Sequence, residues 1–74
     1  MLTIQQRLGR AVRRLRAEAD YSQESFADAV GVHRTYMGLI ERGKTAPTVV
    51  TLQKIAAALR MSLSALLAEA ERER

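Results

Sequence analysis

The sequence has no cysteine and only one histidine, His33, among its 74 residues. Without cysteine, a disulfide framework and a thiolate metal site are both excluded, and a reducing, cytoplasmic setting is expected. A single histidine also excludes a histidine cluster around a metal ion. We therefore expect no metal and no other cofactor.

No apolar run approaches the roughly 18 residues of a membrane span, and the opening MLTIQQRLGR lacks the uninterrupted apolar stretch of a signal peptide. We expect one domain over residues 1–74, free of any membrane. A domain this small buries a modest core, which makes a partner subunit or a ligand plausible. The 12 Lys and Arg against 8 Asp and Glu give a net charge of +4, which favours an anionic partner such as nucleic acid.

Apolar side chains recur at steps of three and four near the start of the chain, at Ile4, Leu8, Val12, Leu15 and Ala19. This spacing predicts an amphipathic helix, and Thr3 with Gln6 forms a capping box at its beginning. Five arginines belong to this helix: Arg7, Arg10, Arg13, Arg14 and Arg16. For most of them we expect a solvated face.

Four more helices are expected from start and stop signals. Ser22 caps the second and Gly31 ends it, the third spans 32–42, and Thr48 and Ser62 cap the fourth and fifth. The side chains expected to point inward are Phe26, Ala27, Val30, Tyr36, Met37, Ile40, Leu52, Ile55, Ala56 and Leu59. Because no segment has the pattern of a strand, the predicted fold class is all-α, a compact five-helix bundle.

The stretch GLIERGKT, residues 38–45, matches G-x-x-x-x-G-K-[ST], the phosphate-binding loop of nucleotide triphosphatases. That loop requires a strand before it and a helix N-terminus after it. Here Gly38 lies inside a predicted helix, and Lys44 follows the C-terminus of that helix, where the dipole disfavours phosphate. Pro47 stands where the next helix would have to begin. We therefore interpret the match as a coincidence.

The longer stretch SQESFADAVGVHRTYMGLIERGKTAPT fits a helix-turn-helix instead. Ala27 is small, so the second and third helices can cross closely, and Gly31 supplies the turn because glycine accepts positive φ. Val32, Met37 and Ile40 then anchor the third helix to the core. A unit of this kind places its second helix in the DNA major groove.

From Leu8 to about Leu67, the chain resembles the phage-repressor-like (Cro and XRE type) helix-turn-helix family, through SQESFA, VGVHRTYMGLIERGKTAPT and TLQKIAAAL. The resemblance implies a lambda-repressor-like DNA-binding domain with the motif at about 22–43. The sequence departs from the family at Asp20-Tyr21, where Gly-Leu is usual, and at Gly38, where a longer polar residue is usual. The second departure bears directly on which side chains reach the bases.

The resemblance also implies site residues. Arg16 and Glu41 match an inward-facing ion pair. The residues expected to contact DNA bases are Arg34, Thr35, Gly38 and Leu39. The residues expected to contact phosphates are Gln23, His33, Tyr36, Arg42 and Lys44. Alternatives stay open for two of them, since His33 could simply be exposed and Gly38 could be tolerated at an exposed site. Tyr36 is expected half in the core, with its hydroxyl free to reach the DNA backbone.

Two such domains related by a two-fold axis would place their third helices about 34 Å apart and read an inverted repeat. The fifth helix, 63–73, is the candidate dimer interface through Leu63, Leu66 and Leu67, although the same leucines could close the core. We expect one face of the helix for each purpose.

The expected function is a sequence-specific transcription regulator that binds double-stranded DNA as a homodimer, such as a repressor or a restriction–modification controller. An antitoxin or a protein-interaction module with the same fold is the alternative, and RNA polymerase or a toxin stays open as a protein partner. An enzyme is not expected, because the chain has one isolated histidine and no paired carboxylates in a pocket that so small a domain could enclose.

Overall fold

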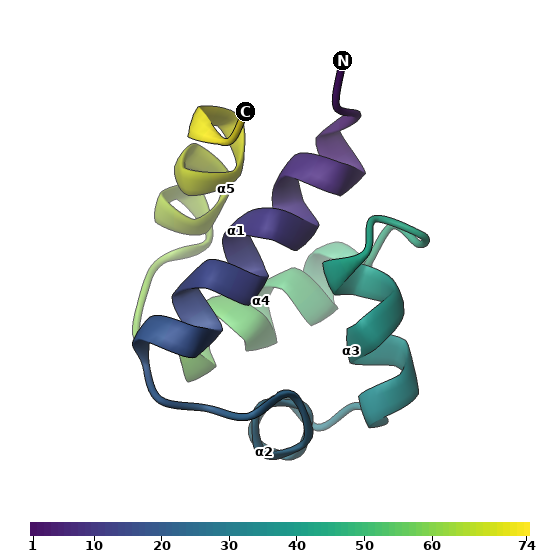
Figure 1. The fold of residues 1–74 in the computed structure, drawn as a ribbon. Coiled ribbons are helices and arrows are strands. Elements are labelled where there is room, and N and C mark those ends of the chain that lie inside the picture. Colours follow the sequence, from purple (N-terminus) through teal and green to yellow (C-terminus); the bar gives the residue numbers. More distant parts are fainter.

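Five helices and no strand make up the protein in a computed structural model that describes all 74 residues (Figure 1). They are α1 (Ile4–Glu18), α2 (Gln23–Val30), α3 (Arg34–Glu41), α4 (Val49–Ala58) and α5 (Leu63–Arg72). The predicted all-α fold is confirmed. The third helix begins two residues later than expected, because His33 has an extended backbone and serves as its N-cap.

Helix starts follow the predicted caps. The side chains of Thr3, Ser22, Thr48 and Ser62 each accept a hydrogen bond from the backbone N–H three residues later. These bonds satisfy N–H groups that have no partner within the helix. Gly31 ends α2 with φ of 88°, so the turn between α2 and α3 uses the left-handed conformation that favours glycine.

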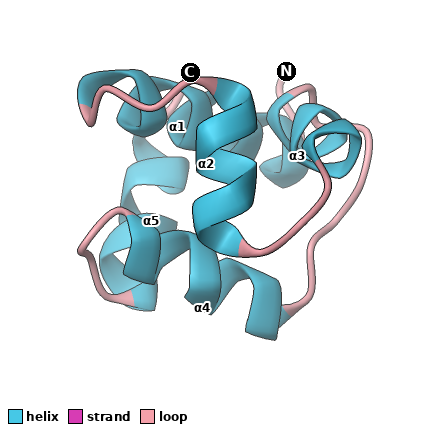
Figure 2. Cartoon of the chain, turned by 90° about the horizontal axis from the view of Figure 1, so that it is seen from below, coloured by secondary structure: helices cyan, strands magenta, loops and turns pink.

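The core lies where the five helices meet. Its largest fully buried side chains are Val12, Phe26, Met37, Ile40, Ile55 and Leu66. Helix α1 packs against both α5 and α3, while α2 packs against α3 and α4. Figure 1 shows α1 passing between α5 and α3, and Figure 2 shows one end of α2 above α4 in the view from below. This packing leaves the outer side of α3 uncovered.

Helix α1 approaches the end of α3 at backbone distance, through Gly9. A Cβ atom at Gly9 would overlap the carbonyl oxygen of Ile40 and would lie 2.5 Å from that of Glu41. No larger residue fits there without moving one helix. The contact fixes the outward-facing residues of α1 beside the C-terminal end of α3.

Helix α5 closes the core against α1 with one of its faces, as expected, and this removes Leu66 from the candidate dimer interface. Leu66 is fully buried, so it belongs to the core and cannot form a surface between two copies. Leu63 is half-buried and Leu67 remains 38% exposed. None of the five helices is by itself long and apolar enough to cross a membrane, and α4 with α5 reaches that length only as a pair bent by 92°.

Candidate nucleic-acid interface

Helix α3 has one side in the core and one side in solvent. Met37 and Ile40 are buried, whereas Arg34 and Thr35 are exposed and Leu39 is half-buried. The turn at Gly31 and the packing of α2 on α3 hold the helix in this orientation. Three of the four residues expected to reach DNA bases therefore lie on an accessible surface.

Gly38 is buried, which corrects the alternative that it is tolerated at an exposed site and removes it from the surface expected to contact DNA bases. A Cβ atom there would lie 3.2 Å from Nη1 of Arg42 and 3.5 Å from Oε1 of Gln23. Both neighbours are side-chain ends rather than backbone. Gly38 therefore leaves room for two polar side chains to lie over the middle of α3.

Arg34 is held by an acidic neighbour from α2. Its Nη1 donates to Oε2 of Glu24 at 3.3 Å, and both side chains are about two thirds exposed, at 65% and 64%. So exposed a pair is weak in water. The Arg34 guanidinium can therefore leave Glu24 and reach another acceptor at little cost in free energy.

The expected pair of Arg16 and Glu41 is present, with Nε of Arg16 2.7 Å from Oε2 of Glu41. Gln23 joins it, because its Nε2 donates to Oε1 of Glu41 at 3.1 Å. The Gln23 side chain thus ties α2 to α3. The backbone N–H of Gln23 stands at the first position of α2, where it has no partner within the helix.

His33 has a structural role that the sequence interpretation missed. Its Nδ1 accepts a hydrogen bond from the backbone N–H of Thr35 at 3.0 Å and so caps α3. A neutral imidazole that accepts at Nδ1 carries its proton on Nε2, which remains a donor. Histidine is an unusual N-cap, so its residue type gave no signal of this role. Tyr36 is half-buried against the core, as predicted, and its contact with a phosphate stays a prediction.

A basic concavity lies between α1 and the segment that follows α3. It has a volume of about 370 Å³ and is lined by Leu2, Gln6, Arg10, Arg13, Glu41, Arg42 and Lys44. The sequence interpretation placed the arginines of α1 on a solvated face without relating them to α3. The structure brings Arg10 and Arg13 together with Arg42 and Lys44, because Gly9 lets α1 lie against the end of α3.

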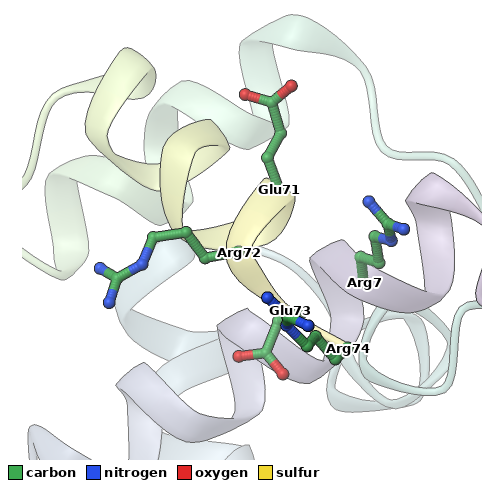
Figure 3. A pocket seen from close by; sticks show the side chains of 5 residues that line it. All are labelled: Arg7, Glu71, Arg72, Glu73 and Arg74. Carbon is green, nitrogen blue, oxygen red and sulfur yellow. The ribbon is translucent and has the colours of Figure 1, made fainter.

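A second concavity, of about 620 Å³, lies between Arg7 and the C-terminal residues 71–74 (Figure 3). Figure 3 shows Glu71 and Arg72 pointing away from Arg7, so the charged groups do not converge on one point. Three arginines and two glutamates line it, and no charge of one sign dominates. Although it is the larger of the two, its chemistry selects no particular ligand.

The two groups with shifted pKa values, Arg14 and Glu69, lie where α1 meets α5. Hydrogen bonds to Glu69 and Glu73, at 2.9 Å each, raise the pKa of Arg14. The hydrogen bond from Arg14 in turn lowers the pKa of Glu69. Arg14 is therefore committed to linking α1 with α5 and contributes little free charge to a nucleic-acid surface.

Comparisons with known proteins agree with this geometry. A family model described as helix-turn-helix matches residues 12–66. The control protein C.MunI of a Mycoplasma species is 43% identical over 74 residues, which cover 99% of this chain and 100% of that protein. The crystal structure of the clp gene regulator ClgR from C. glutamicum superimposes with a TM-score of 0.91 at 28% identity, covering 97% of this chain and 92% of that one.

A third similar protein is the restriction–modification controller protein C.AhdI from Aeromonas hydrophila. Its crystal structure superimposes with a TM-score of 0.79 at 34% identity, covering 82% of this chain and 92% of that one. The family match extends over more than half of the chain and includes the whole of α2 and α3. The chain therefore belongs to the Cro and XRE type helix-turn-helix family of DNA-binding transcription regulators and is not an enzyme.

Proposed function

We propose that the chain reads an inverted-repeat DNA operator as a homodimer, acts in the cytoplasm, and has the role of a restriction–modification controller. The observation that carries the proposal is the division of α3, whose inner side is buried in the core while Arg34 and Thr35 are exposed on its outer side. The likeness to C.MunI over the full length of both chains supports the controller role.

Base recognition falls to Arg34, Thr35 and Leu39. A guanidinium can donate two parallel hydrogen bonds to O6 and N7 of guanine, which is worth about 1–3 kcal/mol of discrimination. The Thr35 hydroxyl can bond to a base edge, and the methyl groups of Thr35 and Leu39 can contact a thymine methyl. Because Gly38 is covered, its backbone is not part of this proposed contact.

The proposed phosphate contacts lie at both ends of α3. At its beginning is Nε2 of the N-cap His33, with the half-buried Tyr36 in the first turn. At its end are the exposed cations Arg42 and Lys44, and the backbone N–H of Gln23 on α2 adds a further donor. Such contacts fix the position of the protein on the duplex and supply most of the affinity, while the base contacts supply specificity.

For the homodimer, Leu63 and Leu67 remain the contact residues on α5 after Leu66 is assigned to the core. Leu67 lies beside the exposed Ile4, and both line an apolar concavity of about 180 Å³ that also includes Pro47. Burial of these side chains by a second copy would remove exposed apolar surface from water.

Selection of bound sites from a random duplex library at about 150 mM salt tests the proposal, since that salt suppresses non-specific binding. We expect an enriched inverted repeat whose half-site spacing reports how the two α3 helices are set. Arg34→Ala should lose the base preference at one position of each half-site. Lys44→Ala should weaken binding to all duplexes alike.

The matched control is Lys54→Ala, which removes one exposed cation from α4. It should change neither the preferred sequence nor the affinity appreciably. Salt-sensitive binding to any duplex, with no enriched sequence, would instead favour an antitoxin or a protein-interaction module. A change of preferred sequence in Lys44→Ala but not in Arg34→Ala would reverse the assigned roles.

A further inference from the structure

The cations of this protein divide into those with an acidic partner and those without one. Arg14 contacts Glu18, Glu69 and Glu73, and Arg16 contacts Glu41. Arg34 and Arg72 also have acidic partners, Glu24 and Glu69. Of the eight Lys and Arg side chains without such a partner, four line the basic concavity: Arg10, Arg13, Arg42 and Lys44. Half of the unpaired cations thus lie at one place, beside the C-terminal end of α3.

The one acidic residue of the concavity does not offset this charge. The Glu41 side chain is 3% exposed, and its carboxylate already accepts hydrogen bonds from Arg16 and Gln23. Arg10, the fourth cation, donates only to the backbone oxygen of Arg74, at 3.0 Å. The concavity therefore presents four guanidinium and ammonium groups to an anion from outside.

We propose that Arg10 and Arg13 of α1, together with Lys44, bind backbone phosphates of DNA next to the base pairs that α3 reads. This inference rests on the proposed function, because it takes the orientation of the duplex from α3. A helix in the major groove lies between the phosphate backbones of the two DNA strands. The concavity stands at the end of α3, where one of these backbones must pass.

The local geometry suits a polyanion better than a small anion. Residues 10 and 13 are one turn apart on α1, so their Cβ atoms are about 5–6 Å from each other and their side chains can follow a strand past successive phosphates. The Gly9 contact holds α1 against the backbone of Ile40 and Glu41, so these arginines keep a constant position relative to α3. The footprint on DNA would then extend beyond the contacts of α3 itself.

Arg13→Ala in the full chain is the variant that tests this, because Arg13 is exposed and has no partner whose loss would disturb the fold. Affinity for the selected operator would be measured from 50 to 200 mM salt. One lost phosphate contact lowers the slope of log K against log salt by about 0.9. The loss of affinity over that range should therefore be about threefold smaller than for the unmodified chain, with the preferred sequence unchanged.

Lys54→Ala is again the matched control, with the same change in net charge on another helix, and it should leave the slope unchanged. Ethylation interference would also map the contacted phosphates. Ethylation of phosphates beside the read bases should block DNA binding by the unmodified chain but not by Arg13→Ala. Equal slopes for Arg13→Ala and the unmodified chain would overturn the inference and leave the proposed function standing. An equal fall in Lys54→Ala would overturn it too, since net charge alone would then explain the effect. An unmodified chain that enriches no sequence would overturn both.

Discussion

The guanidinium of Arg16 donates two hydrogen bonds to the carboxylate of Glu41, from Nε at 2.7 Å and from Nη2 at 3.2 Å. Its remaining nitrogen, Nη1, donates to the backbone oxygen of Tyr21 at 2.9 Å. The side chains of Arg16 and Glu41 are only 14% and 3% exposed. With Gln23 as a third donor, one carboxylate links α1, α2 and the end of α3, and this network fixes the angle of α3.

Replacing Arg16 with methionine should destabilise the fold strongly. The Glu41 carboxylate would stay buried without its charged partner, and removal of one member of a buried pair costs about 3–5 kcal/mol. We expect a value near the lower end, since Arg16 retains some exposure. Urea denaturation followed by circular dichroism measures it, and Arg13→Ala serves as the control, with an expected change within about 0.5 kcal/mol.

The double variant Arg16→Met with Glu41→Leu sharpens this prediction. Because replacing a whole buried pair by apolar residues is often nearly neutral, the double variant should recover most of the lost stability. If Arg16→Met alone unfolded at the same urea concentration as the unmodified chain, the network would contribute nothing to the fold.

Much of the fold was predictable because its signals are local. Thr3, Ser22, Thr48 and Ser62 sit where the backbone N–H groups of a new helix need an acceptor, and each does cap a helix. Apolar spacing likewise identified Phe26, Met37 and Ile55 as core residues. Such features depend on neighbours within a few positions of the chain.

The errors concern relationships between helices. Nothing near Gly38 in the sequence shows that Arg42 and Gln23 cover it, and nothing near Leu66 shows which side of α5 faces the core. The meeting of Arg13 with Lys44 depends on the backbone contact at Gly9, 31 positions before Ile40 in the sequence. Packing of this kind is set by the three-dimensional arrangement and leaves no periodic pattern.

Two helical glycines should respond in opposite ways to alanine. Gly9→Ala forces a Cβ atom into the backbone carbonyl groups of Ile40 and Glu41, so one helix must move, at a cost of about 1–3 kcal/mol or more. Gly38→Ala meets only the side-chain ends of Arg42 and Gln23 and gains helix propensity, so it should stabilise by up to about 1 kcal/mol.

Thermal and urea denaturation of the two variants side by side would measure these changes, with each glycine variant serving as the control for the other. Equal effects of the same sign would show that helix propensity alone governs both positions. A neutral Gly9→Ala would show that α1 and α3 do not touch at backbone distance.

His33 should stabilise α3 through its side chain. His33→Ala removes the acceptor for the Thr35 N–H and should cost about 0.5–2 kcal/mol, the usual value for loss of an N-cap. His33→Ser restores an acceptor and should recover that stability, although it lacks the Nε2 donor. Denaturation measures the stability that the N-cap contributes. Affinity for the selected operator measures the contribution of the Nε2 donor.

The two His33 variants thus separate the structural role from the proposed phosphate contact. A loss of DNA affinity in both variants, with stability lost only in His33→Ala, would fit both roles. Equal stability of the two variants would show that the Nδ1 contact does not cap the helix.

Acid should weaken the attachment of α5 to α1 through Glu69. The hydrogen bond from Arg14 lowers the pKa of Glu69 below its usual value of 4.5, whereas partial burial acts in the opposite direction. A carboxyl group with a lowered pKa in the folded state stabilises the fold above its unfolded pKa, and this contribution is lost as the pH falls through the folded value. The folded chain should therefore lose stability below about pH 4.5 in part through this group.

Glu69→Gln tests the assignment, because glutamine cannot titrate. Denaturation midpoints would be compared at pH 7 and pH 3 for the unmodified chain, for Glu69→Gln, and for Glu71→Gln, an exposed glutamate of the same helix without an ion-pair partner. At pH 7 the Glu69 variant should be the least stable of the three, because it has lost the charged bond to Arg14. At pH 3 its difference from the unmodified chain should shrink, since protonation removes the same charge from the unmodified chain. A difference that stays constant between the two pH values would mean that Glu69 acts by packing rather than by its charge.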